Sequence, residues 1–134
     1  MKSYGLFFLI IIAFTSCDYY DDRLQIKNNS SKVICFDTQN DTFLSYPSIN
    51  DKEFYLSEKI LPGKTKAVAL NGATDAWEQF IAHSHNRTMS LFIFDFDTVV
   101  KYNWDSIRKY GKYIKRYDLK VRDLKLNDWT VIFQ

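Results

Sequence analysis

The stretch Met89–Phe96 constrains the fold more than any other part of the chain. It is apolar at almost every position, and alternate side chains of an extended strand point to opposite faces. Leu91 and Ile93 therefore lie on one face and the phenylalanines of the stretch on the other. Because large apolar side chains on both faces favour burial on both sides, the sequence predicts a central strand with a layer of structure against each face.

Shorter segments with alternating or apolar residues predict further strands, separated by turn residues. The predicted strands cover 24–27, 33–36, 65–70, 113–119 and 129–133. The turn chemistry of residues 28–31 favours a β-hairpin between the first two strands. Residues 37–61 are polar and are expected to form a long loop with one or two short edge strands. In the strand 113–119 we expect Tyr113, Tyr117 and Leu119 to point inward.

Three short helices are predicted between these strands. Asp75 and Glu78 have the spacing of a capping box at the start of the first helix. Asn103 is suited to cap the second, and the third lies near residues 121–126, where Asp118 is the expected cap. We assign the three tryptophans, Trp77, Trp104 and Trp129, to the core. The predicted fold is a β-rich α+β domain, an antiparallel sheet or β-sandwich with two or three short helices at its edge.

The first seventeen residues have the composition of an export signal. One basic residue, Lys2, precedes the apolar run 6–14, and small polar residues lead to Cys17. A helix needs about 20 apolar residues to cross the hydrocarbon layer of a membrane, so this run is too short for a permanent span. The segment is expected to be removed.

A cysteine placed directly after the small residues resembles the lipobox of bacterial lipoproteins. The resemblance implies that signal peptidase II cuts before Cys17 and that acyl chains are attached to this residue. The alternative is an ordinary signal peptide with Cys17 free or paired to Cys35. With Cys17 acylated, we expect Cys35 to be a buried, inert thiol.

The predicted organisation has three parts: a cleaved signal peptide at 1–16, a lipidated cysteine with an acidic tether at 17–23, and a single β-rich globular domain at 24–134. The acidic cluster after Cys17 is similar to the signal that routes lipoproteins of Bacteroides-like bacteria to the outer face of the outer membrane. A solvated tether without routing meaning is the alternative. The expected location is the cell envelope, on the outer membrane, at its periplasmic face or at the cell surface.

The charge balance names no partner by itself. The formal net charge of the chain is +2, and loss of Lys2 with the signal lowers it to +1. The C-terminal third is nevertheless basic and rich in tyrosine. The candidate ligand-binding set is Lys115 and Arg116 with Tyr113 and Tyr117, and it suits a surface polysaccharide or another envelope protein. The alternative is a solvated basic face. We expect no nucleic-acid partner and no cofactor.

Catalytic signatures are weak. His83 and His85 with Asp95 and Asp97 are the residues that a small metal-dependent hydrolase would use. A single His-x-His pair is a poor metal signature, and aspartates at the end of a strand commonly cap the next turn. We therefore expect a membrane-anchored binding or structural module with no enzymatic activity and no metal, and we keep the hydrolase as the alternative.

Recurring blocks in the second half of the chain resemble those of short lipoproteins from Bacteroides-like bacteria. They are Trp77-Glu78, residues 91–95, Tyr102-Asn103-Trp104-Asp105 with Ile107, residues 115–119, Asp123-Leu124 and Asn127-Asp128-Trp129-Thr130. That group has no assigned activity. The resemblance therefore implies a location on the envelope and nothing about a reaction.

Overall fold

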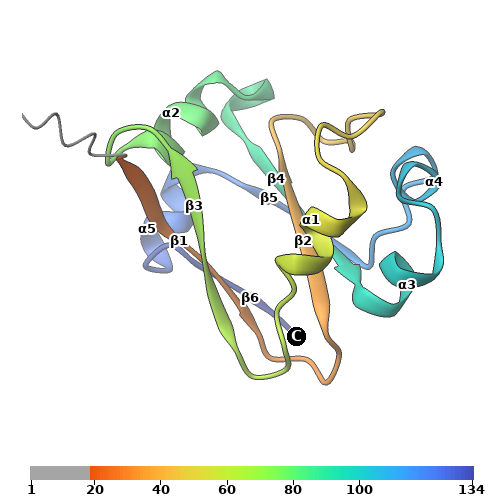
Figure 1. The fold of residues 1–134 in the computed structure, drawn as a ribbon. Coiled ribbons are helices and arrows are strands. Elements are labelled where there is room, and N and C mark those ends of the chain that lie inside the picture. Colours follow the sequence, from red (N-terminus) through yellow and green to blue (C-terminus); the bar gives the residue numbers. More distant parts are fainter. Residues whose placement is uncertain (1–18) are drawn as a thin grey trace, which may run out of the picture.

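The computed structural model describes residues 19–134, which form two three-stranded sheets packed face to face with short helices around them (Figure 1). The first sheet has the order β3-β1-β6 and the second β2-β4-β5. The strands are β1 (Tyr20–Asn28), β2 (Ile34–Gln39), β3 (Thr65–Asn71), β4 (Met89–Asp95), β5 (Lys115–Leu119) and β6 (Thr130–Phe133). All neighbouring strands are antiparallel except β1 and β6, which are parallel. The predicted β-rich α+β class is confirmed.

Short helices connect the strands. They are α1 (Lys52–Ser57), α2 (Ala76–His83), α3 (Phe96–Lys101), α4 (Trp104–Lys109) and α5 (Val121–Leu126), with a 3₁₀ turn at His85–Arg87. α1, α3 and α4 lie beside the second sheet, whereas α2 and α5 lie near the first (Figure 1).

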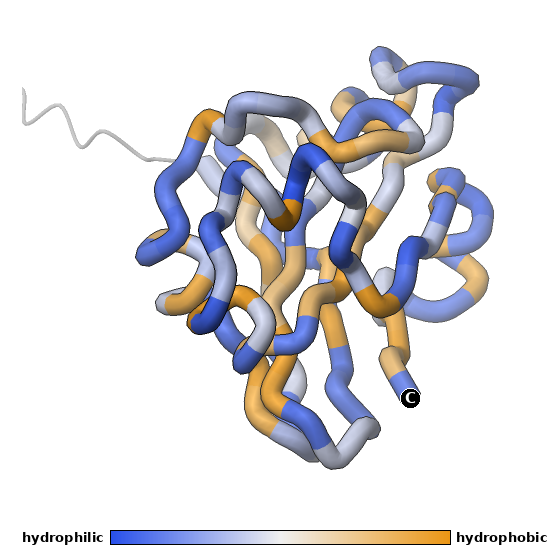
Figure 2. Tube along the Cα trace, turned by 90° about the vertical axis from the view of Figure 1, so that its right-hand side faces the viewer, coloured by the Kyte–Doolittle hydropathy of each residue, from blue (hydrophilic) through white to orange (hydrophobic). Residues whose placement is uncertain are grey.

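The central strand is β4, which is buried on both faces as predicted. Leu91 and Ile93 belong to a cluster that fills the space between the two sheets. Phe92 and Phe94 belong to a second cluster, between the second sheet and the helices, together with Trp104. Figure 2 shows the apolar segments concentrated along the interior strands and the hydrophilic ones in the outer helices and loops. The two faces of one strand thus support two separate cores.

The predicted hairpin between the first two strands is wrong, because β1 and β2 belong to different sheets. Asn28 is buried at the corner between them. Its side-chain amide donates hydrogen bonds to the carbonyls of Lys32 (2.7 Å) and Ile60 (3.0 Å), and its Oδ1 accepts from the backbone N–H of Ser30. Residues that favour a hairpin turn here direct the chain from one layer to the other.

The folded domain begins earlier than predicted. β1 starts at Tyr20 and pairs there with Asn71, so the residues expected to form the end of the acidic tether are part of a strand. Asp21 is only 2% exposed and is not a solvated tether residue. In the long loop after β2, a helix and one isolated bridge, Ile34 to Ile60, replace the expected edge strands. Asp51 caps this helix, α1, by accepting a hydrogen bond from the Phe54 N–H (2.9 Å).

Two predicted helix caps are replaced by other contacts. Asp75 precedes α2 but forms no side-chain cap, because its carboxylate accepts from the side-chain amide of Gln79 (3.1 Å). Glu78 pairs with Arg23 instead of reaching back to the helix start. At α5, Asp123 accepts a hydrogen bond from the Lys120 N–H (3.1 Å), while Asp118 accepts one from the Ser90 hydroxyl (2.8 Å).

Other predictions are confirmed. The Asn103 side chain caps α4 by accepting a hydrogen bond from the Ser106 N–H (3.1 Å). The three tryptophans are buried as expected. Tyr117 and Leu119 point inward as expected and pack against the core between the sheets. The inward orientation expected for Tyr113 is wrong, because this residue lies on the opposite face of the second sheet, with its ring edge-on to Phe92.

The signal, the cleavage position and Cys17 lie outside the described residues. Within residues 19–134, no helix has the length and apolar character that crossing a membrane requires.

Candidate functional site

The structure separates the predicted basic binding set. Tyr117 donates from its hydroxyl to the Ile132 carbonyl (3.1 Å), on the inter-sheet side of β5. Arg116 lies on the other side, where it donates to the Thr42 carbonyl (2.9 Å) and pairs with Asp118 (3.0 Å). Tyr113 lies on the same side as Arg116, with its ring against Phe92. Lys115 lies on the side of Tyr117, over the tyrosine ring. The four side chains do not form one surface.

The histidines and aspartates of the hydrolase alternative also lie apart. His83 and His85 precede β4, and Asp95 ends it, so the length of a seven-residue strand, about 20 Å, separates them. Asp95 caps α3 by accepting from the Thr98 N–H (3.1 Å), which is the capping role considered from the sequence. Within the described part of the chain, no three His, Cys, Asp or Glu side chains gather as a metal-binding group.

Between the free edges of β2 and β3 lies a groove with a volume of about 470 Å³, which we call the inter-sheet groove. Its walls come from β2, β3, α1 and the loop before α1, with Trp77 of α2 and Arg108 of α4 reaching in from behind. Ligand sites are commonly concave regions of this size that combine apolar walls with a few fixed polar groups.

One wall of the groove is apolar. Val68 and Leu70 point from β3 toward the inter-sheet core, and Phe36 faces them from β2. Trp77 is fixed behind this wall because its indole N–H donates to the carbonyls of Asp21 (3.0 Å) and Val68 (3.2 Å). These two carbonyls belong to the paired strands β1 and β3, at the irregularity in their register between Asp21 and Leu24.

The wall at Trp77 is supported by a charged cluster at the start of β1. The Asp21 carboxylate accepts hydrogen bonds from the Trp77 backbone N–H (3.0 Å) and from Arg23 (2.7 Å). Burial raises the pKa of Asp21, but these hydrogen bonds outweigh it and hold the pKa below its ordinary value. Arg23 also pairs with Glu78, whose pKa is lowered by that contact.

The other wall is polar and is organised by a buried ion pair. Arg108 is 3% exposed and pairs with Asp37 (2.6 Å) while donating to the Ser45 carbonyl (2.6 Å) and hydroxyl (2.8 Å). Burial raises the pKa of Asp37 despite the opposing effect of Arg108. The guanidinium thus joins α4, β2 and the loop after β2, which are distant in sequence.

Tyr55 of α1 lies where the polar wall meets the second core. Its hydroxyl is 3.3 Å from the Ser48 hydroxyl, and its ring packs on Trp104 at a centroid distance of 4.4 Å. Burial raises the pKa of the phenol. Perturbed titratable groups beside a concave surface are a feature of binding and catalytic sites.

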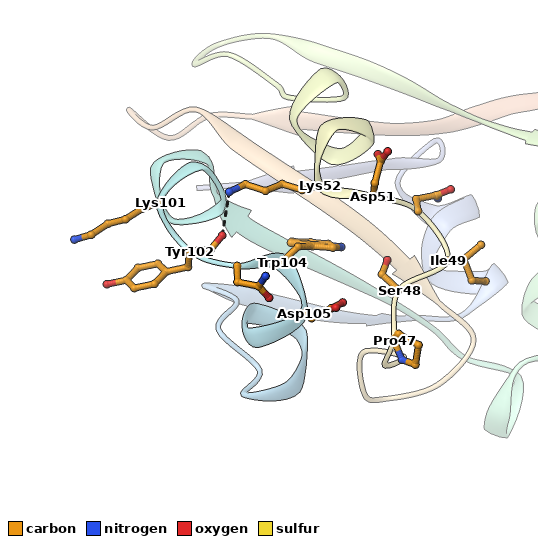
Figure 3. A pocket seen from close by; sticks show the side chains of 11 residues that line it. Pro47, Ser48, Ile49, Asp51, Lys52, Lys101, Tyr102, Trp104 and Asp105 are labelled. Carbon is orange, nitrogen blue, oxygen red and sulfur yellow. Dashed lines mark hydrogen bonds between the residues drawn. The ribbon is translucent and has the colours of Figure 1, made fainter.

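A second concave surface, about 510 Å³, lies on the other side of the loop, between residues 47–52 and 101–105 (Figure 3). Lys52 crosses it and donates to the carbonyls of Val100 (2.6 Å) and Tyr102 (3.0 Å). The Tyr102 and Lys101 side chains point away from the loop that forms the opposite wall (Figure 3). This cleft is more open than the inter-sheet groove and presents less apolar surface, so the groove is the stronger candidate site.

Sequence reasoning missed the groove because its walls belong to elements that are distant along the chain. One signal was available. Trp104, Ile107 and Arg108 have the i, i+3, i+4 spacing of a buried helix face, and a cation on such a face requires a buried partner. The identity of that partner, Asp37, follows only from the tertiary structure.

Comparison with family models, curated proteins and solved structures finds no match for this chain.

Cys35 is buried, has no disulfide partner within residues 19–134, and has a pKa raised by burial to about 12. A thiol in this state is a poor nucleophile, as expected for a packing residue.

Proposed function

We propose that the protein is a lipid-anchored lipoprotein of the bacterial cell envelope that acts as a binding module, with the inter-sheet groove as its ligand site. The observation that carries the binding role is the groove itself, with Val68 and Leu70 on one wall and the Asp37–Arg108 pair on the other. The export signal and the lipobox at Cys17 support the location.

The chemistry of the walls favours an elongated ligand with an apolar face and a polar face. The apolar wall stabilises a ligand by removing surface from water, about 25 cal/mol for each Å² buried. Each guanidinium nitrogen of Arg108 donates to Asp37 or Ser45, and its charge is paired with Asp37 and buried, so it favours no anionic ligand. Uncharged amphipathic molecules, including segments of surface polysaccharide, suit this arrangement.

The location is tested by mass spectrometry of the mature protein purified from membranes. The proposal requires a polypeptide that begins at Cys17 and carries the mass of attached acyl chains. Labelled palmitate supplied to growing cells should enter the protein. A mature chain that starts at another residue, or one that remains unlabelled and freely soluble, would contradict the anchor.

The binding role is tested with a neutral apolar fluorophore, N-phenyl-1-naphthylamine, added to a mature chain that carries Cys17→Ser and therefore no lipid. Phe54 lines the groove and is 47% exposed, so Phe54→Ala should weaken binding several-fold without disturbing the fold. Phe43 is 64% exposed and lies outside the groove, and Phe43→Ala is the matched control. Equal loss in both variants, or no binding by the parent chain, would refute the groove as the site.

A further inference from the structure

The fold begins almost immediately after the proposed anchor. The backbone N–H of Gly72 donates to the carbonyl of Tyr19 (3.0 Å), and Tyr20 pairs with Asn71, so both tyrosines are already held by the domain. Only Asp18 separates Cys17 from Tyr19 in the sequence. Three residue steps from Cys17 to Tyr20 reach at most about 10 Å. An anchor at Cys17 therefore keeps this end of the domain within about 10 Å of the acylated residue.

The same end exposes aromatic side chains. Tyr19 is 67% exposed and Tyr20 is 54% exposed. Tyrosine is enriched at membrane–water interfaces because its ring enters the apolar region while its hydroxyl remains hydrated. If Cys17 is acylated, two exposed tyrosines this close to it lie at the level of the membrane–water interface, where tyrosine is favoured.

Other elements at this end are the turn from β3 to α2 and the helix α5 (Figure 1). α5 leads directly into Trp129, whose ring contacts the Arg23 guanidinium at 4.2 Å. Leu126, at the end of α5, is 76% exposed. α3 and α4 lie on the opposite side of the two sheets, beyond β2 and β4 (Figure 1). The domain therefore has an anchor-side end and a far end.

Resting on the proposed lipid anchor, we infer that the anchor-side end lies against the bilayer, with Tyr19 and Tyr20 in the headgroup layer, and that α3 and α4 face away from the membrane. The charges at this end are of both signs, since β1 carries Asp22 and α5 carries Asp123 together with Arg122 and Lys125. The contact therefore depends on the aromatic side chains rather than on net charge, and a neutral phosphocholine surface is sufficient.

The test places the acylated protein in phosphocholine nanodiscs that contain a trace of a lipid with a gadolinium chelate on its headgroup. Paramagnetic broadening of assigned amide signals then reports proximity to the surface. We expect strong attenuation at Tyr20, Gly72 and Leu126, and retained signals at Ile49 and Asp105. Uniform weak attenuation would mean free tumbling on the tether, and stronger attenuation at Asp105 would mean the reverse orientation; either result overturns the inference.

A matched pair of variants examines the tyrosines. Tyr20→Ser should reduce the attenuation at Leu126 several-fold, because the side chain that holds the end against the headgroups is lost. Tyr110 lies at the far end and is 67% exposed, so Tyr110→Ser should leave the attenuation at Leu126 unchanged. Both positions are exposed, so dispersed spectra are expected for both variants. Equal attenuation in the parent and Tyr20→Ser would show that the tyrosine makes no contact.

The two proposals fail in distinguishable ways. If cells leave Cys17 without lipid, the anchor fails, but the surface contact can still be measured on a chain coupled through Cys17 to a maleimide lipid. Cys35 is buried and will not compete for the maleimide. Loss of fluorophore binding in Phe54→Ala has no bearing on the orientation, because Phe54 lies on α1 and not among the elements of the anchor-side end.

Discussion

At one side of the sandwich a side-chain hydrogen bond connects the edge strands β5 and β6 of the two sheets, whereas at the other side a groove separates the edge strands β2 and β3. At the joined side, Tyr117 of β5 packs against the inter-sheet core and donates to the Ile132 carbonyl of β6. At the divergent side, the space between the strands remains concave, and α1 with its preceding loop lies across it. The same two sheets therefore close one edge with a tyrosine and leave a groove at the other.

The difference teaches that the groove is maintained by polar contacts that hold its walls in place. Arg108 fixes the loop through Ser45 and fixes β2 through Asp37. Asp21 fixes Trp77 behind the opposite wall. Apolar residues alone would favour collapse of the two edges onto each other, since burial of apolar surface is not directional. Four substitutions test this comparison.

The largest effect is expected at the open side, from Arg108→Met. Breaking a buried ion pair by removal of one partner typically costs about 3–5 kcal/mol, because the remaining charge stays buried without compensation. Urea unfolding followed by circular dichroism measures the loss. The double variant Asp37→Leu with Arg108→Met should recover most of the stability, and it should lose fluorophore binding because the contacts that keep the groove from collapsing are gone. A loss below about 1 kcal/mol for the single variant would contradict the role of the pair.

The second effect concerns Asp21→Asn, which removes a charge that accepts hydrogen bonds from Arg23 and Trp77. We expect a loss of about 2 kcal/mol at neutral pH, the scale of hydrogen bonds to charged groups. Because the folded-state pKa of Asp21 is lowered, its contribution is present above the ordinary aspartate pKa and is lost as the pH falls. Urea midpoints of the two chains should therefore converge below about pH 4. A gap that is independent of pH would rule out this linkage.

At the closed side, Tyr117→Phe removes only the hydrogen bond to the Ile132 carbonyl. The expected loss is about 1 kcal/mol, the usual net value for a neutral hydrogen bond. Fluorophore binding should be unchanged, because the groove lies at the other side. Weaker binding in this variant would show that the two sides are coupled, and the comparison between them would then have to be abandoned.

The smallest effect on stability is expected from Phe54→Ala. The side chain is exposed, so the free energy of unfolding should change by about 0.5 kcal/mol, as for other surface substitutions, while fluorophore binding falls. Urea unfolding and fluorescence titration on the same preparation separate the two effects. A large loss of stability would show that Phe54 belongs to the core rather than to the groove.

Much of the local structure was predictable from the sequence. The two faces of β4, the alternation along β3 and β6, and the cap of α4 at Asn103 follow from local periodicity and side-chain chemistry. The hairpin at Asn28 was not predictable, because the same turn residues serve a hairpin or a change of sheet. The supposed tether at Asp21 was misjudged because the partners that make its burial favourable, Arg23 and the N–H of Trp77, are brought together only by folding.

The candidate site illustrates the same limit. The basic set around Lys115 and Arg116 is adjacent in sequence, but neighbouring residues of a strand point to opposite faces. The groove instead joins Asp37, Ser45 and Arg108, which approach one another only when β2, its loop and α4 pack together.

The sequence by itself determined that β4 would be covered on both sides and that the surrounding strands and helices would form a β-rich domain, because periodicity and apolar content are local properties. Tertiary structure alone decided which strands share a sheet, that the domain begins beside the proposed anchor, and that a groove lies between β2 and β3. These features depend on contacts between residues distant along the chain, and each such contact is selected by the packing of the whole domain.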